Sequence, residues 1–546
     1  MIELRGITLA YEGASAPVLD GVDLTIEDGE LVVLSGPTGV GKSTLLGVVA
    51  GLVPSFSGGT LTGDVLIDGR SVIDLPARDR AHVVGFVGQN PAAWFVTDTV
   101  EEELAFGMEQ LGLPPATMRR RVEETLDLLG IADLRHRDLR TLSGGQQQRV
   151  AIGSVLTAHP RLLVLDEPTS ALDPTAAEDV LATLTRLVHD LGVSVLVAEH
   201  RLERVVPFAD RLCLLGGDPE RPGTLRVGAP EDVLRDSPIA PPLVDLGRLA
   251  GWDPLPLTVR DARRRATALR QRLGTPPEPA TRSTAAAPSV DVRRLVLAHG
   301  RTPALRGVDL SLRAGAVTAL MGRNGAGKSS LMWTLQGRHA PASGTVRVAG
   351  AEPSSLRPEQ RRVTTGLVPQ SPADLLYLET VAEECAAADE TSGVDTGTCH
   401  GLLERLAPGI DPDRHPRDLS EGQRLALAVA IVLTARPTVL LLDEPTRGLD
   451  YPAKHALAGM LRDLATEPGA ARTVLVATHD VEFVAQVADD LVVLAEGEVV
   501  SDAPVARGVS ESPAFAPQVT KVLGPGWLSV DQVAAALADA PSGALP

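Results

Sequence analysis

The stretch Gly36-Pro-Thr-Gly-Val-Gly-Lys-Ser43 decides the fold of this chain, and it occurs again as Gly322-Arg-Asn-Gly-Ala-Gly-Lys-Ser329. Each copy follows a short apolar run, which predicts a buried strand leading through a glycine-rich turn into a helix. The glycines let successive backbone N–H groups point at an anion, and the lysine adds positive charge. The helix that begins near the serine favours negative charge at its N-terminus. We therefore predict two phosphate-binding loops in one chain.

Two further pairs of segments extend the repeat. Leu142-Ser-Gly-Gly-Gln146 returns as Leu419-Ser-Glu-Gly-Gln423, and Leu165-Asp-Glu-Pro-Thr169 returns as Leu442-Asp-Glu-Pro-Thr446. The offset between matched residues stays between 277 and 286 along the chain. A nearly constant offset of this size indicates a duplicated domain with small differences in loop length.

A weaker repeat follows each copy. Ser237-Pro-Ile-Ala-Pro-Pro-Leu-Val and Trp252 are echoed by Ser512-Pro-Ala-Phe-Ala-Pro-Gln-Val and Trp527, which predicts a small C-terminal extension on each lobe. Only the stretch between the lobes, rich in Pro, Ala, Ser and Thr, lacks the residues for a core. The predicted division is a first lobe at 1–230, its extension at 231–273, a linker at 274–289, a second lobe at 290–503 and its extension at 504–546.

Within each lobe, strand and helix patterns alternate. Short apolar runs at 30–35, 162–165 and 193–198 are typical of buried parallel strands, and helical patterns lie between them at 118–129 and 146–156. Such alternation predicts an α/β fold with a doubly wound core.

The bulk composition bounds the function. The 546 residues are 44% hydrophobic and 22% charged, as expected of a chain with several globular domains. The 51 basic and 70 acidic residues give a net charge of −19, which argues against nucleic acid as a partner. The three cysteines form no C-x-x-C pair, so we expect neither a disulfide framework nor a zinc site. No apolar run reaches the roughly 18 residues that span a bilayer, so if the protein serves transport, the pore must belong to other chains.

Acidic pairs end an apolar strand in both copies, as Asp166-Glu167 and Asp443-Glu444. The first carboxylate of each pair can hold a hydrated metal, and the second can polarise an attacking water. His200 and His479 each follow a later apolar strand, within reach of a terminal phosphate. The alternatives are an acidic strand end that caps a neighbouring helix and a structural histidine.

In this order, these residues resemble the ATPases of the ABC family, and the resemblance covers both halves of the chain. The Ser-Gly-Gly-Gln segment before a helix distinguishes that family from other proteins with such loops. The resemblance implies tandem P-loop ABC ATPase domains, each with a RecA-like core, a helical signature subdomain and a small C-terminal extension. It also implies ATP hydrolysis with Mg²⁺, and two lobes that pair head to tail within one chain, each signature closing on the nucleotide of the other lobe.

The resemblance assigns two composite sites, with Asp173 and Asp450 matching the family's inter-lobe D-loop. Site one comprises Tyr11, Gly36, Gly39, Gly41, Lys42, Ser43, Thr44, Gln89, Asp166, Glu167 and His200, closed by Ser420 and Gly422. Site two comprises Gly322, Gly325, Gly327, Lys328, Ser329, Ser330, Gln370, Asp443, Glu444 and His479, closed by Ser143, Gly144 and Gly145. The implied catalytic residues are Glu167, Glu444, His200 and His479, and the implied Mg²⁺ ligands, direct or through water, are Ser43, Gln89, Asp166, Ser329, Gln370 and Asp443.

Two positions depart from the family pattern. The adenine-stacking aromatic is Tyr11 in the first lobe, but His299 stands at the aligned position of the second, which predicts weaker adenine binding there. Glu421 replaces the first signature glycine of the second lobe and puts a carboxylate into the loop that closes site one. We therefore expect site two, built on Lys328 and Glu444, to carry most of the hydrolysis.

The segment from Gln89 to Gly107 resembles the ATPases of energy-coupling factor importers of vitamins and metal ions, as do Glu199-His200-Arg201 and the duplicated extension. The resemblance implies a transmembrane coupling subunit, a membrane substrate-binding subunit and a peripheral position on the cytoplasmic face of the membrane. Acidic residues at 101–103 and 383–384 lie where that family receives the membrane partner, or they form a solvated first helical turn. Tandem ATPases of sugar importers and soluble ribosome-associated ABC ATPases are the alternatives, although the latter usually join their lobes through a long charged helical arm.

Overall fold

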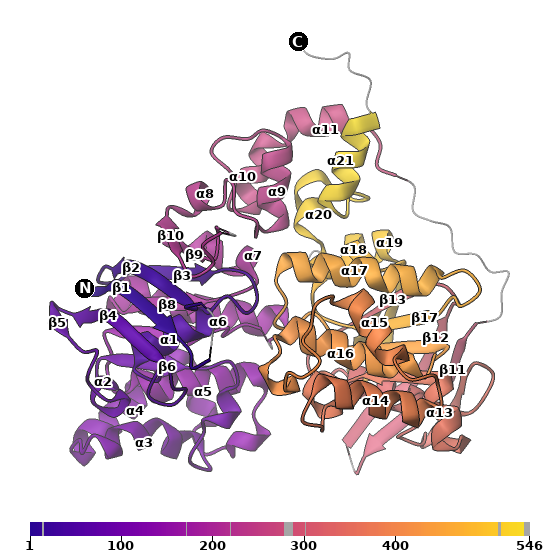
Figure 1. Cartoon of the computed structure of the whole chain (residues 1–546), viewed down its shortest axis with the longest axis horizontal. Coiled ribbons are helices and arrows are strands. Elements are labelled where there is room, and N and C mark those ends of the chain that lie inside the picture. The colour runs from indigo at the N-terminus through magenta and orange to yellow at the C-terminus, as the bar shows by residue number, and fades with distance from the viewer. Residues whose placement is uncertain are drawn as a thin grey trace. The chain divides into compact units, whose positions relative to one another are not determined.

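The computed structural model describes residues 1–13, 16–170, 172–218, 220–277, 288–300, 302–511 and 515–539. The chain forms two compact units, Met1–Thr258 and Val259–Pro546, and each carries one copy of the repeat. In Figure 1 the first unit runs from indigo to magenta and the second from magenta to yellow. Most of the predicted linker at 274–289 and the Ser512–Ala514 segment of the weaker repeat lie outside the described residues.

Two sheets build the first lobe. The antiparallel sheet has the order β2-β1-β4-β5, with bounds Leu19–Ile26, Ile2–Ala10, Thr60–Ile67 and Arg70–Ser71. The larger sheet has the order β10-β9-β3-β8-β7-β6, with bounds Leu225–Gly228, Arg211–Leu215, Leu31–Ser35, Ser194–Ala198, Leu162–Asp166 and Val84–Val87. Its strands are parallel except β10. The predicted strands at 30–35, 162–165 and 193–198 are confirmed as β3, β7 and β8.

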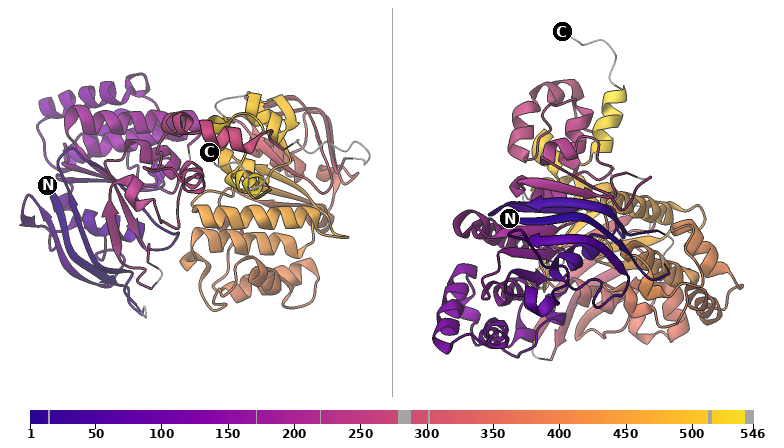
Figure 2. Two further views of the ribbon diagram at one scale, coloured as in Figure 1. Left: turned by 90° about the horizontal axis from the view of Figure 1, so that it is seen from above. Right: turned by 60° about the vertical axis from the view of Figure 1, so that its left-hand side comes forward.

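Helices flank the strands of the first lobe (Figures 1 and 2). Among them, α3, α4 and α5 pack against one another as a helical layer, and α5 packs against β6. The predicted helical segments 118–129 and 146–156 are confirmed within α4 and α5. The helices of this unit are α1 Lys42–Ala50, α2 Ala77–Arg80, α3 Val100–Gln110, α4 Pro115–Leu129, α5 Gly144–Leu156, α6 Pro174–Leu191, α7 Leu202–Val205, α8 Pro230–Val233 and α9 Pro242–Leu249, with 3-10 turns at Pro91–Ala93, Ala132–Leu134, Leu139–Thr141 and Val206–Phe208.

The second lobe repeats this architecture. Its antiparallel sheet has the order β12-β11-β14, with bounds Thr302–Leu312, Val290–His299 and Ser343–Val348. Its larger sheet has the order β15-β16-β17-β13-β18-β19, with bounds Thr365–Val368, Val439–Asp443, Thr473–Ala477, Val317–Met321, Asp490–Ala495 and Glu498–Pro504. Its helices are α12 Lys328–Leu335, α13 Pro358–Thr364, α14 Val381–Ser392, α15 Thr398–Leu406, α16 Glu421–Thr434, α17 Tyr451–Thr466 and α18 Val481–Val487, with 3-10 turns at Pro353–Ser355, Pro372–Leu375 and Pro416–Asp418.

The helix that follows each phosphate loop is a core element. In the first lobe, the buried leucines and valines of α1 form one apolar cluster with residues of both sheets. In the second lobe, Leu331, Met332 and Leu335 of α12 do the same. Since a packed core resists displacement, each phosphate loop is held between a buried strand and a buried helix. The predicted α/β, doubly wound architecture is confirmed in both lobes.

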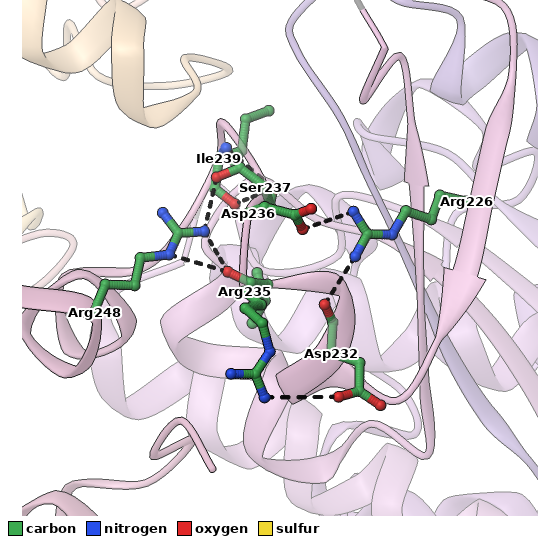
Figure 3. Close-up of polar contacts among 8 residues, drawn as sticks. Arg226, Asp232, Arg235, Asp236, Ser237, Ile239 and Arg248 are labelled. Atoms are coloured by element: carbon green, nitrogen blue, oxygen red, sulfur yellow. Dashed lines mark hydrogen bonds and ion pairs between the residues drawn. The ribbon is translucent and has the colours of Figure 1, made fainter. Parts of the chain in front are cut away.

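The first extension is tied to the sheet of its lobe by arginines (Figure 3). Arg226 of β10 donates to Asp236 Oδ1 at 2.7 Å and to the carbonyl of Asp232 at 2.9 Å. Arg248 of α9 donates to the carbonyls of Leu234 and Ser237. These bonds fix the turn that begins the weaker repeat.

The following helices, α10 Val259–Arg265 and α11 Thr267–Leu273, pack within the second unit. There they meet the second extension, formed by α19 Val505–Glu511, α20 Gln518–Leu523 and α21 Val530–Asp539. Arg263 and Arg270 donate to the carbonyls of Lys521 and Val522. The division between compact units at Thr258 thus falls inside the extension predicted at 231–273. Among the described residues, no helix has the length and apolar character needed to cross a bilayer.

Candidate functional site

The first phosphate loop joins β3 to α1 and is held by contacts that only glycine permits. A Cβ built on Gly36 would lie 2.3 Å from the carbonyl oxygen of Leu215, and Gly41 has a φ of +108°. The ammonium of Lys42 lies over the loop and donates to the carbonyls of Gly36 at 2.8 Å and Pro37 at 2.9 Å. The loop therefore presents a buried positive charge together with the N-terminus of a helix, which is a favourable environment for phosphate.

The second phosphate loop has the same geometry. A Cβ on Gly322 would lie 2.2 Å from the carbonyl oxygen of Leu494, and Gly327 has a φ of +104°. Lys328 Nζ donates to the carbonyls of Gly322 at 2.8 Å and Arg323 at 3.2 Å. Both lobes thus build an anion cradle from the predicted residues.

A buried aspartate faces each loop from the end of a strand. Burial raises the pKa of Asp166 to about 6, while hydrogen bonding from Ser43 opposes this rise. Burial likewise raises the pKa of Asp443, against a hydrogen bond from Ser329. A hydroxyl and a desolvated carboxylate in contact fit Mg²⁺, because oxygen ligands suit that ion and its charge stabilises the ionised carboxylate.

The glutamate after each aspartate occupies an unusual backbone conformation. Glu167 has a φ of +49° and Glu444 a φ of +50°, in the left-handed region that residues other than glycine seldom adopt. Their N–H groups donate to the carbonyls of Ala198 at 2.9 Å and Ala477 at 2.8 Å, which holds the turn. Strain of this kind is concentrated at functional sites, so both glutamates remain the candidate general bases.

Each candidate base has a histidine beside it. His200 Nε2 lies 2.9 Å from Glu167 Oε1, and Gln89 Nε2 donates to that same oxygen at 3.2 Å. In the second lobe, His479 Nδ1 lies 2.8 Å from Glu444 Oε2. All four of these histidine and glutamate side chains are buried. The structure therefore brings together the base and histidine predicted for each lobe.

The predicted signature segments form the N-termini of α5 and α16. Ser143 accepts a hydrogen bond from the N–H of Gln146, whose side chain accepts from the N–H of Ser143. Ser420 and Gln423 form the same reciprocal capping box. A Cβ on Gly145 would lie 2.8 Å from Ala176 Cβ, so this glycine permits close packing against α6. The closing of each signature on the other lobe's nucleotide stays a prediction.

A family model described as ABC transporter matches residues 19–170 and 305–447, which include both phosphate loops and both acidic strand ends. The chain belongs to the ABC transporter family. A protein of Streptomyces avermitilis that carries the name of an ABC transporter ATP-binding protein is 58% identical over 98% of this chain and 100% of its own length. A protein of Methanosarcina mazei with the same name is 33% identical over 93% of this chain and 89% of its own. The chain is an ABC ATPase with two ATP-binding domains.

A solved structure also matches nearly the whole of this ABC ATPase. It is described as a model of ribosome-bound archaeal Pelota and ABCE1, with a TM-score of 0.61 and coverage of 93% of this chain and 80% of that chain. At 23% identity the likeness shows the fold alone. The predicted fold class of tandem P-loop ABC ATPase domains is thereby confirmed.

The predicted base-stacking residues occupy equivalent places in the two lobes of the ABC ATPase. The hydroxyls of Tyr11 and Thr44 share a hydrogen bond of 3.0 Å, and His299 Nε2 lies 3.0 Å from Ser330 Oγ. His339 packs edge-on against His299 with ring centroids 5.2 Å apart. For base stacking the second lobe therefore offers the imidazole of His299, which is smaller than the ring of Tyr11 and packs against the imidazole of His339.

The carboxylate of Glu421 is paired within its own signature. Arg424 Nη1 donates to Glu421 Oε1 at 2.9 Å, and the same guanidinium donates to the carbonyl of Leu419. The side chain of Glu421 also lies against Gly448, where a built Cβ would be 3.0 Å from Glu421 Cγ. The first lobe has Gln147 and Ala171 at the positions of Arg424 and Gly448. Sequence reasoning missed this partnership, although the i, i+3 spacing of Glu421 and Arg424 could have indicated it.

Two carboxylates of the predicted acidic segment at 101–103 form hydrogen bonds that cap α3 and hold the loop before it. Thr99 and Glu102 form the capping box of α3. Glu103 is buried, and its Oε2 accepts hydrogen bonds from the N–H groups of Val96 and Thr97 at 3.0 Å. Glu384 holds the matching segment of the second lobe in the same way. Two of these carboxylates thus shape the loops beside Gln89 and Gln370.

Proposed function

We propose that this ABC ATPase powers an importer of the energy-coupling factor type, for a vitamin, a vitamin precursor or a metal ion. In this proposal it sits peripherally on the cytoplasmic face of the membrane. A transmembrane coupling subunit and a membrane substrate-binding subunit complete the transporter, and nucleic acid takes no part. The resemblance of the segment from Gln89 to Gly107 and the duplicated extension support this assignment.

In the proposed chemistry, each lobe binds one ATP through its own loop. Lys42 and the loop amides bind the phosphates of site one, while Ser43, Asp166 and Gln89 hold Mg²⁺ directly or through water. Bound Mg²⁺ would neutralise charge on the phosphates. The contact between Ser43 and Asp166 supports this assignment. Lys328, Ser329, Asp443 and Gln370 have the matching roles in site two.

Glu167 and Glu444 then act as the general bases. Each polarises the water that attacks the terminal phosphorus and accepts its proton. His200 and His479 hold these carboxylates at 2.9 and 2.8 Å and face the terminal phosphate in the proposed geometry.

One observation carries the assignment to a membrane partner. Directly beyond the Gln89 loop, Trp94 and Val96 are 57% and 63% exposed, and at the matching place in the second lobe Tyr377 is 81% exposed. Exposed apolar side chains of this size favour a protein contact. The buried Glu103 and Glu384 fix the backbone that presents them. Each lobe thus presents exposed apolar side chains to a partner on a loop next to Gln89 or Gln370. In this proposal these glutamines bind Mg²⁺, so partner binding is linked to the nucleotide.

The experiment is purification of the full chain with its membrane partners from cells that express it at native level. The proposal expects a stable complex with an integral coupling protein and a small substrate-binding membrane protein. The double variant Trp94→Ser/Tyr377→Ser should lose both membrane proteins during purification while its ATP binding stays unchanged. Association with ribosomes would support the ribosome-associated alternative, and association with a sugar permease would support the sugar-importer alternative; either result contradicts the proposal.

A further inference from the structure

The second lobe contains a buried ion pair that joins two segments next to its catalytic residues. Lys454 Nζ lies 2.8 Å from Asp480 Oδ2, and their side chains are only 7% and 2% exposed. Lys454 lies on α17, and Asp480 directly precedes α18. Charges buried this deeply require each other, because leaving one unpaired is strongly unfavourable.

Asp480 is the residue after His479, and its other hydrogen bonds hold the turn between β17 and α18 that contains both residues. Its Oδ1 accepts from the N–H of Phe483 at 3.2 Å and caps α18. Its N–H donates to Oγ1 of Thr478 at 3.1 Å. The two neighbours of His479 are therefore bonded to each other, and a helix cap holds the second of them. The ion pair attaches this fixed turn to α17.

Lys454 is equally well fixed at the other end. It lies in the first turn of α17, where its N–H donates to the carbonyl of Asp450 at 3.0 Å. Asp450 Oδ1 accepts from the N–H of Ala453 at 2.9 Å and caps the helix. The chain of contacts therefore runs from Asp450, through Lys454 and Asp480, to His479 and its neighbour Glu444.

The first lobe has a different arrangement. Ala177 and Arg201 stand at the positions of Lys454 and Asp480, so this ion pair has no counterpart there. Instead the buried Glu199 accepts from the Thr169 hydroxyl at 2.9 Å, and Arg204 donates to the carbonyl of Thr169 at 3.1 Å. The residue equivalent to Glu199 is Thr478. The two lobes thus fix their catalytic histidines by different polar contacts.

We propose that Lys454 is a positioning residue for His479, which it holds against Glu444 through Asp480. The proposal rests on the roles proposed above for Glu444 and His479. Lys454 contacts Asp450, Tyr451 and Asp480, which lie at the start of α17 and in the turn beside His479, so its effect falls on the hydrolytic step. A displacement of the turn at Asp450 would therefore move His479 through the Lys454–Asp480 ion pair. The first lobe lacks this pair.

The test uses the full chain carrying Glu167→Gln, which leaves site two as the hydrolytic site. The variants are Lys454→Met, Lys454→Arg and the double variant Lys454→Met/Asp480→Asn, which removes both charges and leaves no unpaired one in the interior. Arg472→Met is the matched control, because Arg472 pairs with Glu467 at 2.5 Å near the far end of α17. For each protein, kcat, KM for ATP and the melting temperature are measured, and the series is repeated with Glu167 intact.

Lys454→Met and the double variant should each lose at least fivefold in kcat with KM within twofold of the parent. Lys454→Arg should keep at least half of the parental kcat, and Arg472→Met should keep nearly all of it. A kcat within twofold of the parent in the folded double variant would overturn the proposal, as would an equal loss in Arg472→Met. Failure of the roles proposed for Glu444 and His479 is distinguishable, because adding Glu444→Gln to the Glu167→Gln chain would then leave ATP hydrolysis unchanged.

Discussion

Replacing Arg424 with Gln should leave the negative charge of Glu421 without its positive partner in the signature loop of the second lobe. Gln is the residue that the first lobe has at this position, where Gln147 Nε2 donates to the carbonyl of Leu139 at 3.3 Å. The substitution therefore removes the positive charge and retains a donor for the backbone. By the pairing that the family resemblance implies, the affected site is the one built on Lys42 and Glu167.

The magnitude follows from the charges. A carboxylate about 4 Å from a phosphate oxygen costs about 1 kcal/mol in water and about 4 kcal/mol at an effective dielectric of 20. A guanidinium about 3 Å farther from the phosphate cancels roughly half of either figure. The side chain of Glu421 is 45% exposed, so a cost near the lower end, about 1–2 kcal/mol, applies. Losing Arg424 should then cost about 0.5–1 kcal/mol, which corresponds to a two- to fivefold slower reaction.

The assay is steady-state hydrolysis at saturating ATP in chains carrying Glu444→Gln, so that turnover reports site one. Arg424→Gln should lower kcat two- to fivefold, and added salt should reduce the effect because it screens exposed charges. Adding Glu421→Gly gives the signature the same Ser-Gly-Gly-Gln-Gln sequence as the first lobe and should restore kcat. Gln147→Ala in chains carrying Glu167→Gln, where turnover reports site two, supplies the control for loss of the backbone bond alone. An unchanged kcat in Arg424→Gln, or no recovery on adding Glu421→Gly, would refute the electrostatic reasoning.

Three other results are expected. Glu444→Gln should reduce steady-state hydrolysis of the assembled transporter more than Glu167→Gln, and a larger loss from Glu167→Gln would reverse the predicted asymmetry. Burial raises the pKa of Asp166 to about 6, so protonation should weaken Mg-ATP binding by site one as the pH falls below 6; titration calorimetry should show this, and Asp166→Asn should abolish the dependence. Glu103→Ala removes the buried acceptor of the Val96 and Thr97 N–H groups and should lower the free energy of unfolding by about 1–3 kcal/mol. Glu101→Ala removes a partly exposed carboxylate and should lower the free energy of unfolding by at most about 1 kcal/mol. Denaturant titration measures both variants.

Much of the fold could be predicted because its signals are local and duplicated. Gly36, Gly322 and Gly327 are required by close contacts with backbone carbonyls. Strands such as β7 and β8 are buried on both faces and therefore appear in the sequence as apolar runs. The contacts within each candidate site also follow from sequence order, because parallel strands bring their carboxyl ends to one edge of the sheet. Glu167 and His200 follow the carboxyl ends of the neighbouring strands β7 and β8 and meet there.

The contacts that sequence reasoning missed depend on side chains from separate elements. The partnership of Lys454 with Asp480 joins residues 26 positions apart and follows no repeat, because the first lobe lacks both. The sequence places Glu103 in a charged run, yet its side chain is buried and accepts hydrogen bonds from the N–H groups of Val96 and Thr97. The packing of α10 and α11 within the second unit reflects tertiary contacts of Arg263 and Arg270 that no local pattern contains.

The family resemblance predicts that one chain forms two composite ATP sites by pairing its own lobes, and this is the central prediction. The most direct measurement is the mass in solution of the Glu167→Gln/Glu444→Gln chain by light scattering, combined with the number of ATP molecules bound in the presence of Mg²⁺. The account predicts the mass of one chain with two ATP bound, unchanged as protein concentration rises. Two ATP per chain bound only when the mass doubles would contradict it.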